Sequence, residues 1–189
     1  MQLSPRFTTA LTWATELHAK QMRKGSGVPY ISHLLGVTAI ALEYGANEDE
    51  AIAALLHDAI EDRGGAKTKA EIRRRFGDTV TEIVVGCTDT ETIPKPPWRE
   101  RKQAYLAHLP TASVSIRLVS AADKLHNCRS ILQDYRLLGD ELWQRFQGGK
   151  EGTLWYYRSL VEAFRQADFN PLVAELNRVV CELENLVAK

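Results

Sequence analysis

Four ionisable residues lie close together in the segment AIAALLHDAIED, which spans residues 51–62. His57 and Asp58 are adjacent, and Glu61 and Asp62 follow one helical turn later. On a continuous helix these four side chains would share one face, opposite a face of leucine, isoleucine and alanine. Clustered carboxylates repel one another unless a cation or protons lie between them, and a neighbouring histidine favours a transition metal or zinc over magnesium. Because an acidic helix face is more often simply solvated, a metal site here needs ligands from other parts of the chain.

Two further residues are suited to complete such a site. His33 follows a loop with two glycines and a proline, and we expect it at the start of a helix. Asp123 lies among apolar residues in a long predicted helix, 113–134, so we expect it to be buried and paired. Alanines precede Asp123 and allow other segments to approach closely, and Asn127 shares its face of the helix. Two imidazoles and two carboxylates suit one Mn²⁺, Fe²⁺ or Zn²⁺ ion, with positions left for water.

The chemistry that such a site would perform is hydrolysis. A metal lowers the pKa of its bound water, which then becomes a nucleophile near neutral pH. Glu61 or Asp62 could orient or deprotonate that water. Arg23 and Lys24 on one loop and Lys95 on another carry groups that match phosphate oxygens. We therefore predict metal-assisted hydrolysis of a phosphate ester or anhydride.

The elements that must position these residues are all helical. The sequence has no strand alternation longer than a few residues, so we predict an all-α fold in one domain, residues 1–189. We expect the motifs in a core of about 4–134, followed by C-terminal helices at about 153–187. Expected N-caps are Ser4, Ser32, Asn47 with Glu50, and Thr68 with Glu71. The predicted helices are 4–21, 34–44, 47–62, 68–77, 79–86, 99–108, 113–134, 153–166 and 170–187.

Composition narrows the class of partner. The chain has 189 residues, 44% of them hydrophobic, and a formal net charge of zero, which is typical of a soluble domain that does not bind nucleic acid non-specifically. Its three cysteines have no CxxC spacing, so neither a disulfide framework nor a zinc knuckle is expected. No apolar run reaches the length of a membrane span, and the N-terminus has no signal-peptide pattern. We expect a cytoplasmic protein, and its balanced charge is compatible with a local basic pocket for a small anion.

Four ordered motifs, RKGSGVPYISH, ALLHDAIED, EIRRRFG and SAADKLHNCRS, resemble the hydrolase domain of the RelA/SpoT homologues. The likeness is to the stand-alone small alarmone hydrolases of the HD superfamily, from about residue 14 to 129 and again around WYYRSL. It implies a single helical HD domain with a mononuclear Mn²⁺ site. The implied metal ligands are His33, His57, Asp58 and Asp123. The implied pair that assists the water is Glu61 and Asp62, and the implied nucleotide contacts are Arg23, Lys24, Lys95, Asn127 and Tyr156.

The resemblance further implies a reaction. It predicts Mn²⁺-dependent removal of the 3′-pyrophosphate from ppGpp and pppGpp, giving GDP or GTP and pyrophosphate. Another nucleotide phosphatase of the superfamily is the enzyme alternative, acting on NADPH, an adenosine alarmone or a deoxynucleotide. A nucleotide sensor is the alternative without catalysis, although a sensor needs no water-activating carboxylates. The sequence leaves base preference open and is compatible with a homo-oligomer.

Overall fold

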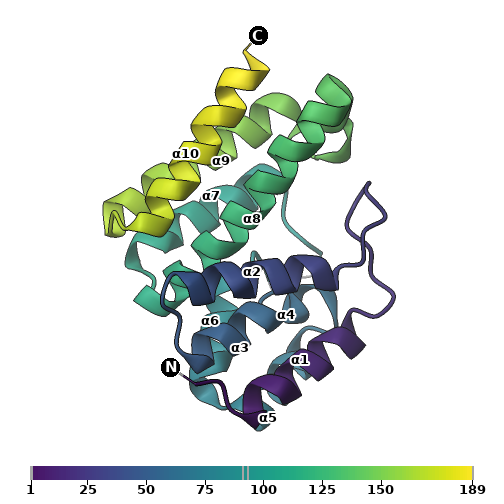
Figure 1. The fold of residues 1–189 in the computed structure, drawn as a ribbon, viewed down its shortest axis with the longest axis vertical. Coiled ribbons are helices and arrows are strands. Elements are labelled where there is room, and N and C mark those ends of the chain that lie inside the picture. Colours follow the sequence, from purple (N-terminus) through teal and green to yellow (C-terminus); the bar gives the residue numbers. More distant parts are fainter. Residues whose placement is uncertain (1, 91, 93, 189) are drawn as a thin grey trace.

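The computed structural model describes residues 2–90, 92 and 94–188, and its regular elements are helical (Figure 1). Within the described residues there is no β-strand; Met22 and Pro29 form one isolated bridge at the base of a loop. None of the described helices is both long enough and apolar enough to cross a membrane. The α-helices are α1 (Pro5–Leu17), α2 (Ile31–Glu43), α3 (Glu48–Leu56), α4 (Ala59–Asp62), α5 (Ala66–Phe76), α6 (Asp78–Cys87), α7 (Trp98–His108), α8 (Val114–Leu138), α9 (Gly149–Ala167) and α10 (Pro171–Val187), and the 3-10 helices are η1 (Leu109–Thr111) and η2 (Gly139–Arg145).

Several helix starts are fixed by the predicted side chains. The Ser4 hydroxyl accepts a hydrogen bond from the Arg6 amide ahead of Pro5, the first residue of α1. Asn47 and Glu50 form a reciprocal capping box at α3, with hydrogen bonds of 3.0 and 2.7 Å. These capping side chains bond to backbone amides that would otherwise lack hydrogen-bond partners, and so they fix where each helix begins. Helix α3 in turn leads directly to the site.

The predicted continuous helix over 47–62 is wrong. Helix α3 ends at Leu56, and α4 begins at Ala59. His57 and Asp58 lie in the turn between them, where Asp58 has φ −97° and ψ −2°. Two contacts hold the turn, one tertiary and one local: the Tyr30 hydroxyl donates to the Asp58 carboxylate at 2.5 Å, and His57 bonds back to the Ala54 carbonyl of α3. The regular 100° spacing therefore does not describe how the four ionisable residues face one another.

Two predicted caps are also wrong. Helix α5 begins at Ala66, because Gly64 and Gly65 adopt positive φ and turn the chain before it. Thr68 lies inside α5, where its hydroxyl donates to the Arg63 carbonyl, and so it caps nothing. Ser32 is likewise inside α2, which begins at Ile31. In both cases another residue supplies the turn, so the capping side chain is not needed.

The core is centred on α3. Residues 51–56 are completely buried, and α3 packs against α1, α2, α6 and α8. Helix α8 runs from this core to the opposite end of the molecule, where α9 and α10 pack on it (Figure 1). One continuous cluster of buried apolar residues joins both ends. The turn that follows α3 is thus held from several sides, which positions His57 and Asp58 rigidly.

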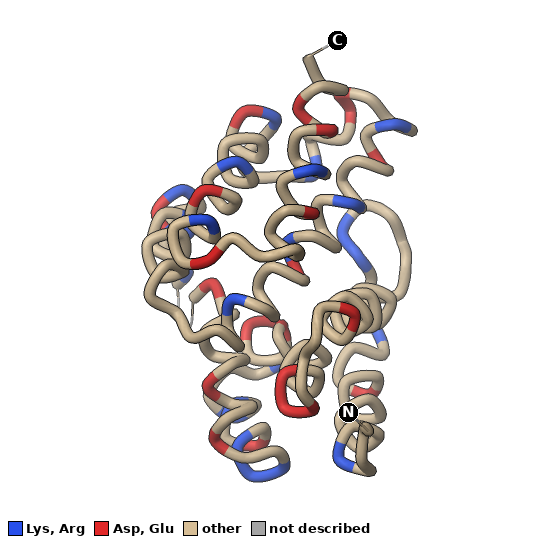
Figure 2. The backbone as a smooth tube through the Cα atoms, turned by 60° about the vertical axis from the view of Figure 1, so that its left-hand side comes forward, with Lys and Arg blue, Asp and Glu red and all other residues tan. Residues whose placement is uncertain are grey.

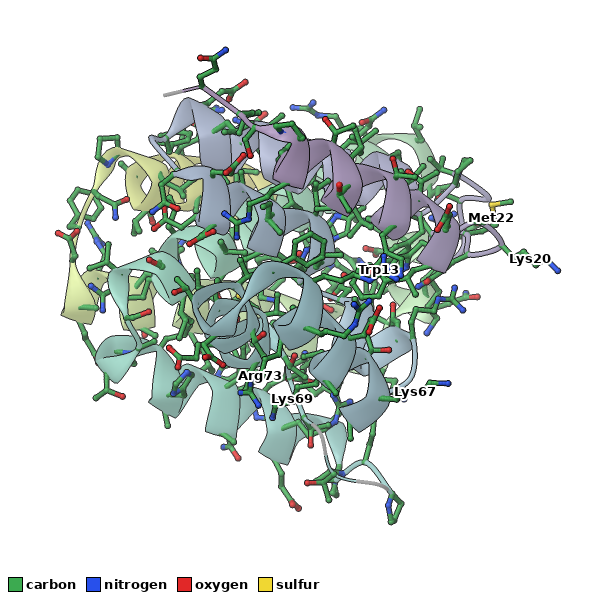
Figure 3. All side chains as sticks on the ribbon, turned by 90° about the horizontal axis from the view of Figure 1, so that it is seen from below. Trp13, Lys20, Met22, Lys67, Lys69 and Arg73 are labelled. Carbon is green, nitrogen blue, oxygen red and sulfur yellow. The ribbon has the colours of Figure 1, made fainter. Side chains whose placement is uncertain are left out.

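The surface carries both signs of charge along the whole length of the molecule (Figure 2). Seen from below, Lys20 and Met22 project from one edge, while Trp13 lies among the helices (Figure 3). Trp13 is buried against Phe76, with ring centroids 6.0 Å apart. The arginines at 73–75 are paired with Asp78 and Glu71. Among the described residues these arginines therefore do not add up to a broad basic surface, and positive charge must be gathered locally to bind an anion.

Candidate metal centre and active site

Four predicted ligands meet between three segments of the chain. His33 comes from α2, His57 and Asp58 from the turn after α3, and Asp123 from α8. The two Nε2 atoms of the histidines are 3.2 Å apart. His33 Nε2 lies 3.2 Å from Asp123 Oδ1, and His57 Nε2 lies 3.0 Å from Asp58 Oδ2. The donor atoms of His33, His57 and Asp58 lie within 4.8 Å of one another, and Asp123 Oδ1 lies within 3.6 Å of both histidine nitrogens. Three of the four residues, His33, His57 and Asp123, are almost completely buried.

The electrostatics of this cluster favour a bound cation. Burial would raise the pKa values of Asp58 and Asp123, but the neighbouring His57 and, for Asp123, the Lys124 ammonium hold them well below their usual range. Burial would lower the pKa of His57, but the two carboxylates raise it well above its ordinary value. Ionised carboxylates thus face imidazole nitrogens in a space shielded from water. This donor set fits a divalent transition metal, which would replace the protons that hold the cluster together.

The groups behind the donors fix their orientation. His57 Nδ1 donates to the Ala54 carbonyl at 2.8 Å, which leaves the lone pair on Nε2 facing the cluster. Asn127 donates to Asp123 Oδ1 at 2.5 Å, and Lys124 pairs with Asp123 Oδ2 at 2.6 Å. Sequence reasoning did not assign Tyr30 or Lys124 to the site. Both lie beside predicted ligands in the PYISH and ADKLHN motifs, and that proximity was the available signal.

His33 is oriented by a third histidine. Its Nδ1 lies 3.0 Å from Nδ1 of His126, so one of these two nitrogens must carry the proton. Burial, followed by the charge of His33, lowers the pKa of His126 to about 4, so the His126 ring is neutral and can accept. A proton on His33 Nδ1 leaves the Nε2 lone pair free for a metal. His126 itself was not among the predicted site residues.

Gly36 makes room for His126, and filling this space is expected to weaken the site. A Cβ atom at Gly36 would lie 2.2 Å from His126 Cδ2. Gly36→Ala should therefore displace the imidazole that orients His33 and weaken Mn²⁺ binding by about 10- to 100-fold, the usual cost of losing an outer partner of a metal ligand. Titration of the metal-free protein with Mn²⁺ measures this. Leu35→Ala, at an exposed position of the same helix, is the control; equal affinities in both folded variants would contradict the expectation.

A cavity of about 590 Å³ opens beside the cluster. Tyr30, Lys124 and Asn127 line it and also bond to the two carboxylate donors, Asp58 and Asp123, so they form the boundary between the two spaces. Positive charge is concentrated in the lining, because among the described lining residues one carboxylate, Asp134, accompanies five basic side chains. Those basic residues are Arg23, Lys24, Lys102, Lys124 and Arg145. The cavity is therefore suited to an anion larger than a single phosphate.

The structure brings most of the predicted nucleotide contacts to this cavity. Arg23, Lys24, Asn127 and Tyr156 line it, while Lys95 is not part of the lining. Arg23 donates to Asn127 at 2.9 Å, and Asn127 in turn donates to Asp123, which links the cavity to the cluster. The Tyr156 hydroxyl is buried and has no hydrogen-bond partner among the described residues. An unpaired buried hydroxyl is costly unless a bound molecule satisfies it, so it marks a contact point.

Glu61 and Asp62 have different surroundings. Glu61 pairs with Lys95 at 2.7 Å, whereas Asp62 accepts a hydrogen bond from Gln21 at 2.6 Å. Partial burial of its carboxylate, with the charges of Asp58 and Glu61, raises the pKa of Asp62 despite the opposing effect of that hydrogen bond. A carboxylate with a raised pKa is a better proton acceptor, whereas the Glu61 carboxylate is held in an ion pair. The two residues are thus not equivalent.

The helical fold and the histidine–aspartate turn are those of a known class of protein domain, the HD domain. The chain belongs to the HD domain family, whose model matches residues 10–154. It is similar to the guanosine-3′,5′-bis(diphosphate) 3′-pyrophosphohydrolase MESH1 of Xenopus tropicalis, with 42% identity over 125 residues, 65% of this chain and 67% of that protein. The predicted all-α fold and the predicted family are confirmed.

Two solved structures have a similar fold. One is a metazoan orthologue of SpoT that hydrolyses ppGpp and plays a role in starvation responses, with a TM-score of 0.80, 25% identity and coverage of 96% of this chain and 97% of that one. The other is the Listeria monocytogenes protein lmo0812, with a TM-score of 0.71, 29% identity and coverage of 83% and 99%. The first match extends beyond the family region, so the C-terminal helices belong to the shared architecture.

Proposed function

We propose that this protein is a metal-dependent hydrolase that removes the 3′-pyrophosphate from ppGpp and pppGpp, releasing GDP or GTP. The observation that carries the proposal is the hydrogen-bonded link from the donor cluster through Asn127 to Arg23 in the cationic cavity. It joins a metal-binding set to a pocket for a polyphosphate. The names of the similar proteins supply the specific reaction.

The proposed metal is one Mn²⁺ ion, held by His33, His57, Asp58 and Asp123. An ion bound there would polarise a phosphoryl oxygen and lower the pKa of a water molecule. Both imidazoles present Nε2 toward the cluster because their Nδ1 atoms are engaged elsewhere. Tyr30 donates to the Asp58 oxygen that faces the histidines, and Lys124 pairs with the Asp123 oxygen that faces away from them, so both carboxylates are oriented before the ion arrives.

Asp62 is the proposed proton acceptor for the attacking water. Its carboxylate has no ammonium partner in the described structure, and its raised pKa brings it closer to the range in which a general base is effective. Glu61 is the second member of the pair, and its bond to Lys95 keeps that lysine beside the site. Glu61 therefore contributes charge and position more than proton transfer.

The nucleotide is held by charge and by aromatic surfaces. Arg23 and Lys24 approach from the loop before α2, and Arg145, from η2, lies against Gly25 of the same loop. Lys102 and Lys124 add cations from α7 and α8, and several cations from different elements suit a ligand with phosphates at both its 5′ and 3′ ends. Trp98 and Tyr156 supply apolar faces for the nucleoside, and the unpaired Tyr156 hydroxyl supplies a hydrogen bond.

Product analysis tests the proposal. Metal-free protein is expected to be inactive, and Mn²⁺ should restore conversion of ppGpp to GDP and intact pyrophosphate. Chromatography that resolves pyrophosphate from orthophosphate identifies the broken bond, and NADPH serves as the competing substrate. Orthophosphate as the only phosphorus product, or rapid dephosphorylation of NADPH without any reaction of ppGpp, would contradict the proposal.

A further inference from the structure

A hydrogen-bonded network ends on the Asp62 carboxylate. Its centre is Gln21, which follows α1, and its other members are His18 and Arg63. His18 Nδ1 lies 2.7 Å from Gln21 Oε1, and Arg63 donates to the same oxygen at 2.5 Å. Gln21 Nε2 donates to Asp62 Oδ2 at 2.6 Å. This series of hydrogen bonds thus connects the residues that follow α1 to the end of α4.

The network determines which way the Gln21 amide faces. Two donors converge on Oε1, so the NH₂ group must point at Asp62. Burial lowers the pKa of His18 in spite of its bond to Gln21, so its ring is neutral and Nδ1 carries the donated proton. The other ring nitrogen, Nε2, is buried without a hydrogen-bond partner among the described residues. A buried ring nitrogen without a partner costs free energy. The fold accepts this cost because the other nitrogen of the ring, Nδ1, is needed for the hydrogen bond to Gln21.

His18 also connects this network to the metal ligands. Its ring stacks on Tyr30, with centroids 5.2 Å apart and planes 17° apart. The Tyr30 hydroxyl holds Asp58 at 2.5 Å. One buried ring therefore braces the hydrogen bond to Asp62 and the hydrogen bond to Asp58 simultaneously. Gln21 and His18 do not line the cavity, so neither is placed to contact the nucleotide.

We propose that Gln21, fixed by His18 and Arg63, is a positioning residue that orients the Asp62 carboxylate for proton transfer. This inference rests on the proposed function, which assigns Asp62 to the water. A neutral amide suits the task because it orients the carboxylate through one hydrogen bond and leaves its charge in place. An ammonium or guanidinium in direct contact would instead hold the carboxylate in an ion pair, as Lys95 holds Glu61.

Kinetics of the Mn²⁺-loaded protein test the role of Gln21. Gln21→Leu is expected to lower kcat for ppGpp by about 10- to 100-fold, the usual cost of misplacing a reacting group, with little change in KM. In an Asp62→Asn background the same substitution should cost less than about 2-fold, because the base that it positions is already gone. Gln103→Leu, at an exposed position of α7, is the matched control. An equal cost of Gln21→Leu in both backgrounds, or an unchanged kcat, would overturn the inference.

Two variants of His18 test the donated proton. Asparagine offers an N–H near the position of Nδ1, so His18→Asn should retain more turnover than His18→Leu. Heteronuclear NMR should show the Nδ1–H tautomer of His18 in the wild type without any substrate; the Nε2–H tautomer would overturn the inference. A wild type that does not cleave ppGpp would instead contradict the proposed function. Failure of the inference about Gln21 gives a different result: the wild type cleaves ppGpp, and the Gln21 and His18 variants cleave it equally well.

Discussion

Replacing His33 with alanine is expected to deprive the protein of its divalent ion and to lower ppGpp hydrolysis by about 1,000-fold or more. The estimate follows from the several kcal/mol that a catalytic metal contributes to the transition state. His33 is almost completely buried and lies against four other members of the site, because its Nε2 faces His57, Asp58 and Asp123 and its Nδ1 faces His126. Elemental analysis of purified protein, together with the ppGpp assay, measures both effects.

The chain provides a matched control for this substitution. His108 lies at the exposed end of α7, outside the cluster and the cavity. His108→Ala should keep about one equivalent of metal per chain and normal turnover. Equal metal content and equal activity in His33→Ala and His108→Ala would remove the basis for the proposed centre.

Asp62→Asn is expected to separate catalysis from metal binding. The variant should retain its ion and lose about 100- to 10,000-fold in kcat, the usual contribution of a positioned general base. Asparagine is nearly the same size as aspartate and can still accept from Gln21, so the geometry changes little while the proton acceptor is lost. Metal analysis and steady-state kinetics at saturating Mn²⁺ measure the two properties independently.

Glu61→Gln distinguishes the roles of the two neighbouring carboxylates. It removes the ion pair with Lys95 and should have a smaller effect on kcat than Asp62→Asn. Simultaneous loss of metal and activity in either variant would identify that carboxylate as a ligand. Normal turnover in both variants would leave the proposed mechanism without its base.

The proposed ligands could be placed from sequence because each lies in a short motif whose local structure is simple. His33 follows a loop that contains Pro29, and Asp123 lies on a long helix beside small residues. An all-α fold was therefore enough to predict that both residues lie near His57 and Asp58. Helix caps at Ser4 and Asn47 were similarly predictable, since a cap depends on residues within one turn.

The turn at His57 and Asp58 could not be predicted in this way. Helix propensity and periodicity both favour an unbroken helix, and the break depends on a hydrogen bond from Tyr30, which is 28 residues away in sequence. The pairing of Lys95 with Glu61 is also tertiary, as are the contributions of Lys102 and Arg145 to the cavity. Charged residues far apart in sequence carry no signal of which carboxylate or cavity they will reach.

Helix α8 has a consequence for the size of the ligand. It supplies Asp123 to the cluster, and Lys124 and Asp134 to the cavity lining. Because an α-helix rises about 1.5 Å per residue, the ten residues from Lys124 to Asp134 span about 15 Å of one cavity wall. The regular rise of the helix therefore fixes the distance between the side chains that it contributes to the cavity. An inserted residue would rotate every later side chain by about 100° and so change which side chains of α8 face the cavity.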